Sequence, residues 1–422
     1  LTQETCTSFF KTMNTLKEQV ASGRETTRKF YSNLIKEAEE FESFLDMHGA
    51  RENRTWAYFT EFVASIRNLG KASFYVKHLY DRYPFYHLRD PEDMQRRFYD
   101  DATSMLNFLN HSLLGIYEEC VREGKKNKLM IPAQAIPIES FQELEAYKRL
   151  PKNAEDEVIK EEEDRIIDLL EKVCSVAKML EEMKVSLSSD QMELKRMIPS
   201  RIDEKKARLL LNHVHTAQSE FDTYIKNTTI EQKHEYLKHV RGYISMPLHL
   251  LESMIWLIHF YERHEDEIRK SGAKSVISSR VQKKELLSHI INFCFFYCLF
   301  YMKEGEKLSR VILKSLVKTV RYDLPVPVPL GFHARPSTYV SLIVRRYGAE
   351  AWLFVDHEKY DAKSVMSLLQ AGGMIADKGY QTVVFEGNKQ VLDDLKILAA
   401  HNYCEECGIP PELDYLRSAR EG

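Results

Sequence analysis

The sequence predicts a multidomain protein, a large all-α region followed by a small α+β domain with the element order βαββαβα. The first 320 residues contain long apolar patterns with a period near 3.6 residues, which is typical of helices. After residue 321 the patterns become short and glycine becomes denser, since eight of the sixteen glycines lie in the last 101 residues. We therefore expect a helical bundle over residues 1–320, an α+β domain over 322–405 and a C-terminal tail over 406–422.

The composition excludes several classes of protein. The chain has 422 residues with 60 basic and 63 acidic side chains, so no net field draws it to nucleic acid or to an anionic membrane. Its seven cysteines are odd in number and mostly lie in helical patterns, which argues against a secreted disulfide framework. The first segment is amphipathic and lacks the apolar core of a signal peptide. These features predict a cytoplasmic protein without a nucleic-acid partner.

Long helices are expected in the first region, at residues 26–48, 90–123 and 229–270. The most apolar segment, Leu286–Met302, contains polar residues and is shorter than the roughly 20 apolar residues that span a bilayer. A buried helix is therefore favoured and no membrane span is expected. A helix that contacts a membrane is the alternative.

The segment 159–197 has a coiled-coil-like seam. Its apolar residues, from Ile159 to Met197, alternate at spacings of three and four, with Glu162 and Asp190 at two seam positions. This pattern predicts either an antiparallel hairpin within one bundle or a contact between two chains, because heptads alone do not fix the number of strands. The second interpretation would make the protein a homodimer.

Three alternating prolines open the C-terminal region. In an extended strand, Pro325, Pro327 and Pro329 would all lack backbone donors on the same side. A strand tolerates that loss only at the edge of a sheet, with the donor-free side facing solvent. Residues 323–329 are therefore predicted as an edge strand.

A histidine follows this strand at the start of a predicted helix over 334–347. Gly331 supplies a turn, Pro336 suits the first helical turn, and His333 lies at the helix N-terminus. Unpaired N–H groups and the helix dipole favour an anion there, and Arg335 offers bidentate contacts to phosphate oxygens. Because a neutral imidazole is a competent nucleophile, the pattern indicates a phosphorylated histidine. The alternative is that His333 and Arg335 merely cap the turn.

The rest of the domain continues the same order of elements. The patterns predict strands at 350–355, 359–361 and 381–386 and helices at 364–377 and 388–402.

Three motifs in this order, "GFHARPS", "DAKSVMSLLQAGG" and "KGYQTVVFEG", closely resemble the HPr family, the histidine-containing phosphocarriers of the bacterial phosphoenolpyruvate:sugar phosphotransferase system. The resemblance covers residues 322–405 and does not extend to the helical region. It implies an open-faced sandwich, with three helices on one face of a four-stranded antiparallel sheet and the first strand at an edge. It also implies a carrier with a phosphohistidine intermediate rather than a turnover enzyme, with no cofactor.

The resemblance assigns roles to individual residues. His333 would be phosphorylated on Nδ1, Arg335 would steady the phosphoryl group, and Ser364 would be a regulatory phosphorylation site. The predicted partners are an enzyme I-like donor and an enzyme IIA-like or regulatory acceptor. They would dock on a face formed by four residues, Phe332, Val365, Met366 and Leu369. For the last three, core packing is the alternative interpretation.

The sequence contains only incomplete metal-binding motifs. His401, Cys404 and Cys407 have a spacing that allows three zinc ligands, but a structural zinc site normally needs four. A single Glu-x-x-His, Glu231 with His234, falls short of the two that a di-iron bundle requires. We therefore expect no metal. Two alternatives to a phosphoacceptor remain, a scaffold with an inactive HPr fold and, less favoured, a metal-binding helical protein.

Overall fold

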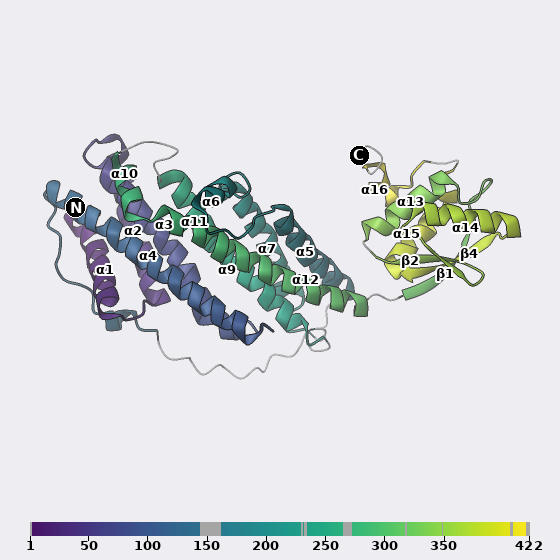
Figure 1. Cartoon of the computed structure of the whole chain (residues 1–422), viewed down its shortest axis with the longest axis horizontal. Coiled ribbons are helices and arrows are strands. Elements are labelled where there is room, and N and C mark those ends of the chain that lie inside the picture. Colours follow the sequence, from purple (N-terminus) through teal and green to yellow (C-terminus); the bar gives the residue numbers. More distant parts are fainter. Residues whose placement is uncertain are drawn as a thin grey trace. The chain divides into compact units, whose positions relative to one another are not determined.

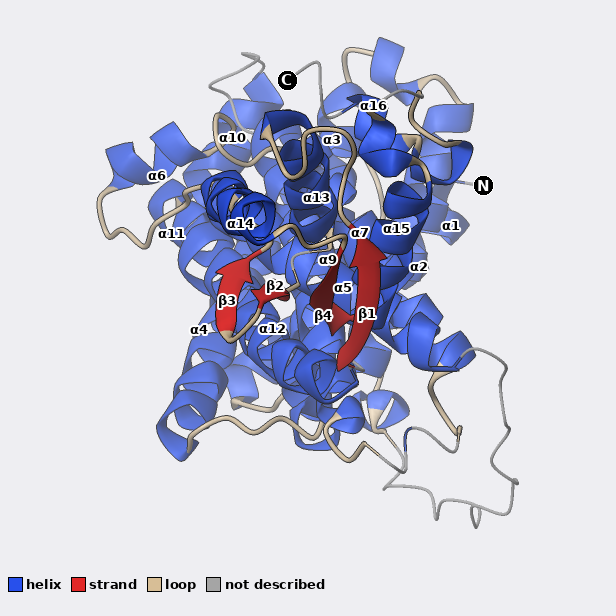
Figure 2. Ribbon diagram, turned by 90° about the vertical axis from the view of Figure 1, so that its right-hand side faces the viewer, coloured by secondary structure: helices blue, strands red, loops and turns tan. Residues whose placement is uncertain are grey.

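The computed structural model describes residues 2–143, 162–228, 231, 234–264, 272–316, 319–347, 349–405 and 408–418. It divides into two compact units, Leu1–Ile312 and Leu313–Gly422. The first unit is built from helices, and the second combines helices with a four-stranded antiparallel sheet (Figures 1 and 2).

The described helices of the first unit are α1 (Thr2–Ser22), α2 (Arg28–Met47), α3 (Ala57–Arg82), α4 (Glu92–Lys126), α5 (Glu162–Glu182), α6 (Gln191–Met197), α7 (Glu204–Tyr224), α9 (Leu237–His264), α10 (Gly272–Arg280), α11 (Lys283–Ser288) and α12 (Phe296–Leu316). Short helical turns lie at Ala50–Glu52, Tyr83–Phe85 and Ile138–Phe141. Helix α3 packs against α2, α4 and α9, and its buried residues occupy most of its length. The unit is therefore organised around α3.

The most apolar segment of the chain belongs to one continuous helix. A π-helical stretch, His289–Phe295, joins α11 to α12, and Lys283–Lys314 is long and apolar enough to cross a membrane by length and composition. The structure buries 61% of its most apolar window inside the protein, as happens for the core helix of a soluble domain. Ile290, Cys294 and Tyr301 are fully buried there.

The predicted hairpin over 159–197 is corrected by the structure. Helix α5 ends at Glu182, before Lys184 adopts a left-handed backbone with φ of 51°, and Leu187 is half exposed. The seam residues of α5 are buried, but α5 packs against α7, and α6 packs against α11. The heptad-like spacing thus reflects one buried helix face and not a two-helix hairpin. Ile159 lies outside the described residues.

The second unit contains β1 (Thr319–Pro325), α13 (Ala334–Arg346), β2 (Ala351–Val355), β3 (Glu358–Asp361), α14 (Val365–Lys378), β4 (Thr382–Asn388) and α15 (Lys389–Ala400), followed by short turns at Asn402–Cys404 and Pro411–Leu413 and by α16 (Tyr415–Ser418). The strands lie in the order β1-β4-β2-β3, and every pairing is antiparallel. The order of elements and the edge position of the first strand agree with the prediction from sequence.

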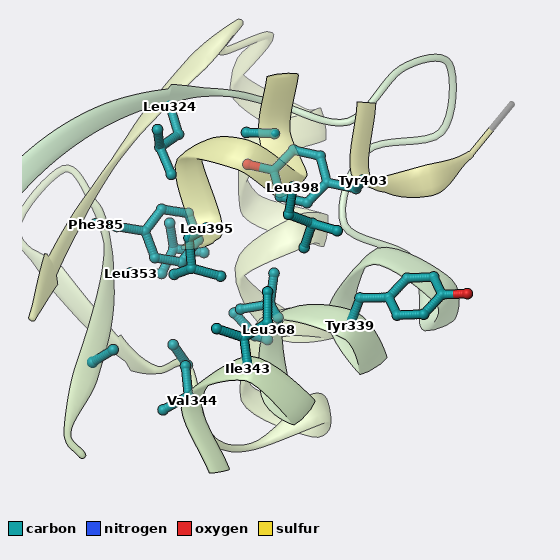
Figure 3. Packing of buried hydrophobic residues seen from close by; sticks show 14 of the residues in the cluster. Leu324, Tyr339, Ile343, Val344, Leu353, Leu368, Phe385, Leu395, Leu398 and Tyr403 are labelled. Carbon is teal, nitrogen blue, oxygen red and sulfur yellow. The ribbon is translucent and has the colours of Figure 1, made fainter. Parts of the chain in front are cut away.

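One face of this sheet is buried and the other is more open. Alternate residues Ala351, Leu353 and Val355 of β2 and Val383 and Phe385 of β4 are buried, because successive side chains of a strand point to opposite faces. Helix α15 packs on β1 and β4, α14 packs on β2 and β3, and α13 packs on both helices. Figure 3 shows the resulting core, in which Leu353 and Phe385 meet leucines from the helices.

The first strand differs from the prediction in its limits. It begins at Thr319, so the expected boundary near residue 321 falls inside it, and it ends at Pro325 instead of residue 329. The N–H of Val326 still donates to the Gln381 carbonyl at 2.9 Å, so the donor-free side at Pro325 faces away from β4. The edge argument therefore holds for Pro325. The other two prolines belong to the following turn.

The predicted C-terminal tail is also corrected. Leu413 and Leu416 are fully buried in the core of the second unit, because their apolar side chains pack beside the residues of α13 and α15. Residues 408–418 are thus part of the fold.

Candidate functional site

A tight loop brings His333 to the start of α13. Gly331 adopts a positive φ of 67°, which favours glycine, and its N–H donates to the Pro327 carbonyl at 2.8 Å. The His333 N–H donates to the Gly331 carbonyl at 2.9 Å. His333 is the N-cap residue of α13, as the sequence predicted.

The two ring nitrogens of His333 have different surroundings. Nδ1 accepts a long hydrogen bond of 3.5 Å from the backbone N–H of Arg335, in the first turn of the helix. Nε2 lies 2.9 Å from the Oε2 atom of Glu405. The His333 side chain is 33% exposed, whereas that of Glu405 is only 12% exposed. The ring is thus anchored on one side and accessible from solvent.

This arrangement assigns the tautomer of the imidazole. An ionised carboxylate accepts hydrogen bonds and cannot donate them, so Nε2 carries the proton and donates to Glu405. The backbone N–H of Arg335 likewise can only donate, so Nδ1 presents its lone pair to it. The nitrogen with the lone pair therefore faces the N-terminal end of α13, where helix N–H groups favour an incoming anion.

Glu405 is the residue of this site that the sequence analysis missed. It lies directly after a turn in which Asn402, Tyr403 and Cys404 all have positive φ, between 46° and 60°. Each such residue other than glycine costs on the order of 1 kcal/mol. Three in succession persist only where surrounding contacts hold them.

Those contacts connect the turn to the loop before His333. The Asn402 amide accepts from the Val328 N–H at 2.9 Å and donates to the Val328 carbonyl at 2.6 Å. The buried Tyr403 donates its hydroxyl to the Pro325 carbonyl at 2.9 Å, and its ring packs edge-on against Phe332. The turn and the His333 loop are therefore fixed to each other at several points. Of these, the Asn-containing turn is the one weak signal that the sequence offered, because asparagine tolerates left-handed backbone better than most residues.

Phe332 is not part of a docking surface, which corrects the prediction for this residue. Its side chain is 2% exposed and packs against Phe385 and Tyr403. A large aromatic ring beside the histidine contributes to the core instead and anchors the loop.

The other predicted docking residues lie at the start of α14. Met366 is 68% exposed, while Val365 and Leu369 are half-buried. The fully buried residue of this turn is Leu368, so the core-facing stripe of α14 runs through that position. Met366 is therefore available to a partner, and its two neighbours are shared between the surface and the helix packing.

Arg335 and Ser364 both lie in helix N-terminal positions. The Arg335 side chain is exposed in the first turn of α13. Ser364 is the N-cap of α14, and its hydroxyl accepts from the Ser367 N–H at 3.3 Å. Capping accounts for the presence of a serine at that position.

A close backbone approach joins α14 to the same loop. A Cβ atom added to Gly372 would lie 2.5 Å from the Phe332 carbonyl oxygen, so no larger residue fits there without movement. The next residue, Gly373, has nothing within 4 Å of such an atom. Gly372 thus sets how near α14 lies to the residue before His333.

The metal candidates are not gathered into a site in the described part of the chain. No group of three or more His, Cys, Asp or Glu side chains there could hold a metal ion. Cys404 is buried in the core, His401 is exposed with its Nδ1 atom 3.0 Å from the Ile397 carbonyl, and Cys407 lies outside the described residues.

The helical unit has a cavity of about 1030 Å³. Its lining contains charged side chains of both signs, including Glu42, Glu61 and Arg67, and two histidines, His259 and His264. These groups pair with each other: Glu42 lies 2.5 Å from Arg67, and His264 lies 3.0 Å from Glu61. Because the charges neutralise one another, the lining favours no one class of ligand.

Comparison with known proteins adds no identification. No protein-family model, curated protein or solved structure matches this chain.

Proposed function

We propose that this chain is an HPr-like phosphoacceptor that takes a phosphoryl group on Nδ1 of His333. The observation that carries the proposal is the partly exposed His333 ring at the N-terminus of α13, whose Nε2 is held by Glu405 while Nδ1 keeps its lone pair. This geometry provides a nucleophile, an electrostatically favourable place for an anion and a neighbouring guanidinium on Arg335. The βαββαβα order and the edge position of β1 support the family resemblance.

In this proposal the protein works in the cytoplasm as a tethered carrier or regulatory module. An enzyme I-like protein donates the phosphoryl group, and an enzyme IIA-like or regulatory protein receives it. Met366 contributes the exposed apolar contact to these partners, with the half-buried Val365 and Leu369 beside it. A phosphate on Ser364 would add about −1.5 to −2 charges next to that contact and so regulate docking.

The test is phosphorylation of the full-length protein by phosphoenolpyruvate and a general enzyme I. Intact-mass analysis is expected to show the gain of one phosphoryl group, in an adduct that is labile to acid and stable to alkali. His333→Gln should abolish the gain, because it removes the nucleophile. Absence of the adduct in the wild type with several sources of enzyme I would favour the alternative, a scaffold in which the fold outlasts the activity.

A further inference from the structure

The carboxylate beside His333 offers more than a structural contact. Glu405 lies 72 positions along the chain from the histidine, and its side chain is nearly buried. Its second oxygen, Oε1, is buried and has no hydrogen-bond partner among the described residues. A buried carboxylate oxygen without a hydrogen-bond partner lowers the stability of the fold, unless the charge of the carboxylate stabilises a neighbouring group. The group that it contacts is the His333 ring.

We infer that Glu405 is a positioning residue, which holds His333 in the tautomer with Nε2 protonated and so reserves Nδ1 as the phosphoryl acceptor. This inference rests on the proposed phosphoacceptor function. The two nitrogens of a free imidazole compete for a phosphoryl group, and a carboxylate hydrogen bond on one of them fixes both the tautomer and the orientation of the ring. The choice of nitrogen is therefore made by a residue outside the histidine's own helix.

The Nδ1 lone pair forms a bond to phosphorus while the bond between phosphorus and the donor's leaving atom breaks, and the leaving atom keeps that electron pair. The His333 ring then carries a positive charge with its proton still on Nε2. Glu405 accepts that proton in a hydrogen bond and its negative charge offsets the charge of the ring. No proton has to leave Nε2 during the transfer.

The backbone geometry supports the same role. The three residues before Glu405 have left-handed backbone, and their contacts with Val328, Pro325 and Phe332 tie the turn to the His333 loop. A turn that is strained and held at several points places its next side chain reproducibly. The strain thus has a direct consequence for the position of the carboxylate.

The test compares Glu405→Gln with Glu412→Gln in the full-length protein. Both changes remove one negative charge from the same terminal segment, but Glu412 is exposed and away from the ring contact. Long-range proton–nitrogen NMR correlations of His333, recorded at a pH where the ring is neutral, report which nitrogen is protonated. Wild type and Glu412→Gln should show the proton on Nε2. Glu405→Gln should show a mixture of tautomers, because a glutamine amide can either donate or accept.

The same proteins are then treated with phosphoramidate, a small donor that requires no partner protein. Glu405→Gln is expected to react at Nδ1 more slowly by on the order of tenfold to a hundredfold and to give more adduct on Nε2. Glu405→Asp should restore part of the Nδ1 selectivity if the turn accommodates the shorter side chain. An unchanged backbone amide spectrum away from the site verifies that each variant is folded.

The outcomes separate this inference from the proposed function. If Glu405→Gln keeps the wild-type tautomer and the wild-type ratio of Nδ1 to Nε2 adduct, Glu405 has no positioning role. If enzyme I fails to phosphorylate the wild type but the tautomer responds to Glu405, the proposed function fails and the positioning inference stands.

Discussion

A histidine–glutamate pair of the helical unit and one of the C-terminal unit have nearly the same contact distance and opposite consequences. In the helical unit, His264 Nδ1 lies 3.0 Å from Glu61 Oε2, and in the C-terminal unit His333 Nε2 lies 2.9 Å from Glu405 Oε2. The other nitrogen of His264 is 3.1 Å from the amide nitrogen of Asn68. The Asn68 amide is oriented by Arg67, whose Nε and Nη2 atoms donate to its oxygen. His264 therefore has no free lone pair.

The difference lies in the second nitrogen and in exposure. The His264 side chain is 8% exposed and both of its ring nitrogens are occupied, so the ring serves as a structural link between α9 and α3. Burial raises the pKa of Glu61, but the hydrogen bond with His264 and the electrostatic attraction of His264, Lys274 and Arg51 together outweigh burial and leave the pKa lowered. The His333 side chain is 33% exposed, and its Nδ1 has only the long 3.5 Å hydrogen bond from the Arg335 N–H at a helix N-terminus. A carboxylate partner alone thus does not indicate reactivity, and the state of the remaining nitrogen decides it.

Replacing each of the two histidines by glutamine gives the strongest test of this comparison. His333→Gln is expected to remove the phosphoryl adduct completely while leaving the helical unit as stable as before. His264→Gln should retain the adduct but lower the free energy of unfolding of the helical unit by about 2 kcal/mol, since it disrupts one buried and one partly buried hydrogen bond. Intact mass after enzyme I treatment and urea titration measure the two effects. An adduct that persists in His333→Gln and disappears in His264→Gln would reverse the assignment.

A third histidine, His289, is largely buried and has no carboxylate partner among the described residues. It extends the comparison to the pH dependence of stability. Burial against the core, where its ring packs on Phe108, lowers the pKa of His289 from 6.5 to about 4. Below pH 6.5 the unfolded chain therefore binds a proton at His289, whereas the folded chain does not bind it until the pH falls to about 4. The free energy of unfolding is therefore unaffected by His289 above pH 6.5. As the pH falls from 6.5 toward 4, it decreases by at most about 3 kcal/mol.

His289→Phe keeps an aromatic ring in that place and removes the titration. Urea midpoints measured between pH 7 and pH 4 should fall less steeply in this variant than in the wild type. His111→Phe, which changes an exposed histidine of α4, is the matched control and should keep the wild-type slope. Equal slopes in wild type and His289→Phe would show that burial of His289 does not govern the acid response.

Local patterns predicted much of the C-terminal unit. The limits of α13, β2 and α14 lie within about two residues of those expected, because caps, alternation and turn residues act over short distances. The same locality explains why His333 was found, since Gly331, Pro336 and the apolar stripe of α13 all belong to its own segment.

Contacts between distant segments were not predictable in this way. Glu405 meets His333 through a left-handed turn that residue types barely signal, and its partner lies 72 positions away. The sequence predicts Phe332 as a surface residue, because its burial depends on Phe385 and Tyr403, which come from other elements. The apolar face of α5 was predicted correctly, but the helix that packs on it was not. Periodicity identifies a buried face and not the helix that covers it.

The smallest expected effect concerns the adjacent glycines of α14, and it tests how tightly the His333 loop must be held. In an α-helix, replacing glycine by alanine stabilises by up to about 1 kcal/mol through backbone entropy alone. Gly373→Ala has open space and should show this gain, with phosphorylation unchanged. Gly372→Ala places a methyl group 2.5 Å from the Phe332 carbonyl oxygen, and neither backbone can yield without moving α14 or the loop.

We therefore expect Gly372→Ala to lose about 1 to 2 kcal/mol despite the same helix-propensity gain. Because Phe332 precedes His333, the displacement should also slow phosphorylation of His333 several-fold by moving Nδ1 relative to the first turn of α13. Urea titration and the rate of phosphoramidate labelling of the two variants provide the measurement. Equal stabilities for the pair would mean that the close approach at Gly372 relaxes freely. Lower stability with an unchanged labelling rate would mean that the position of the loop does not limit the reactivity of His333.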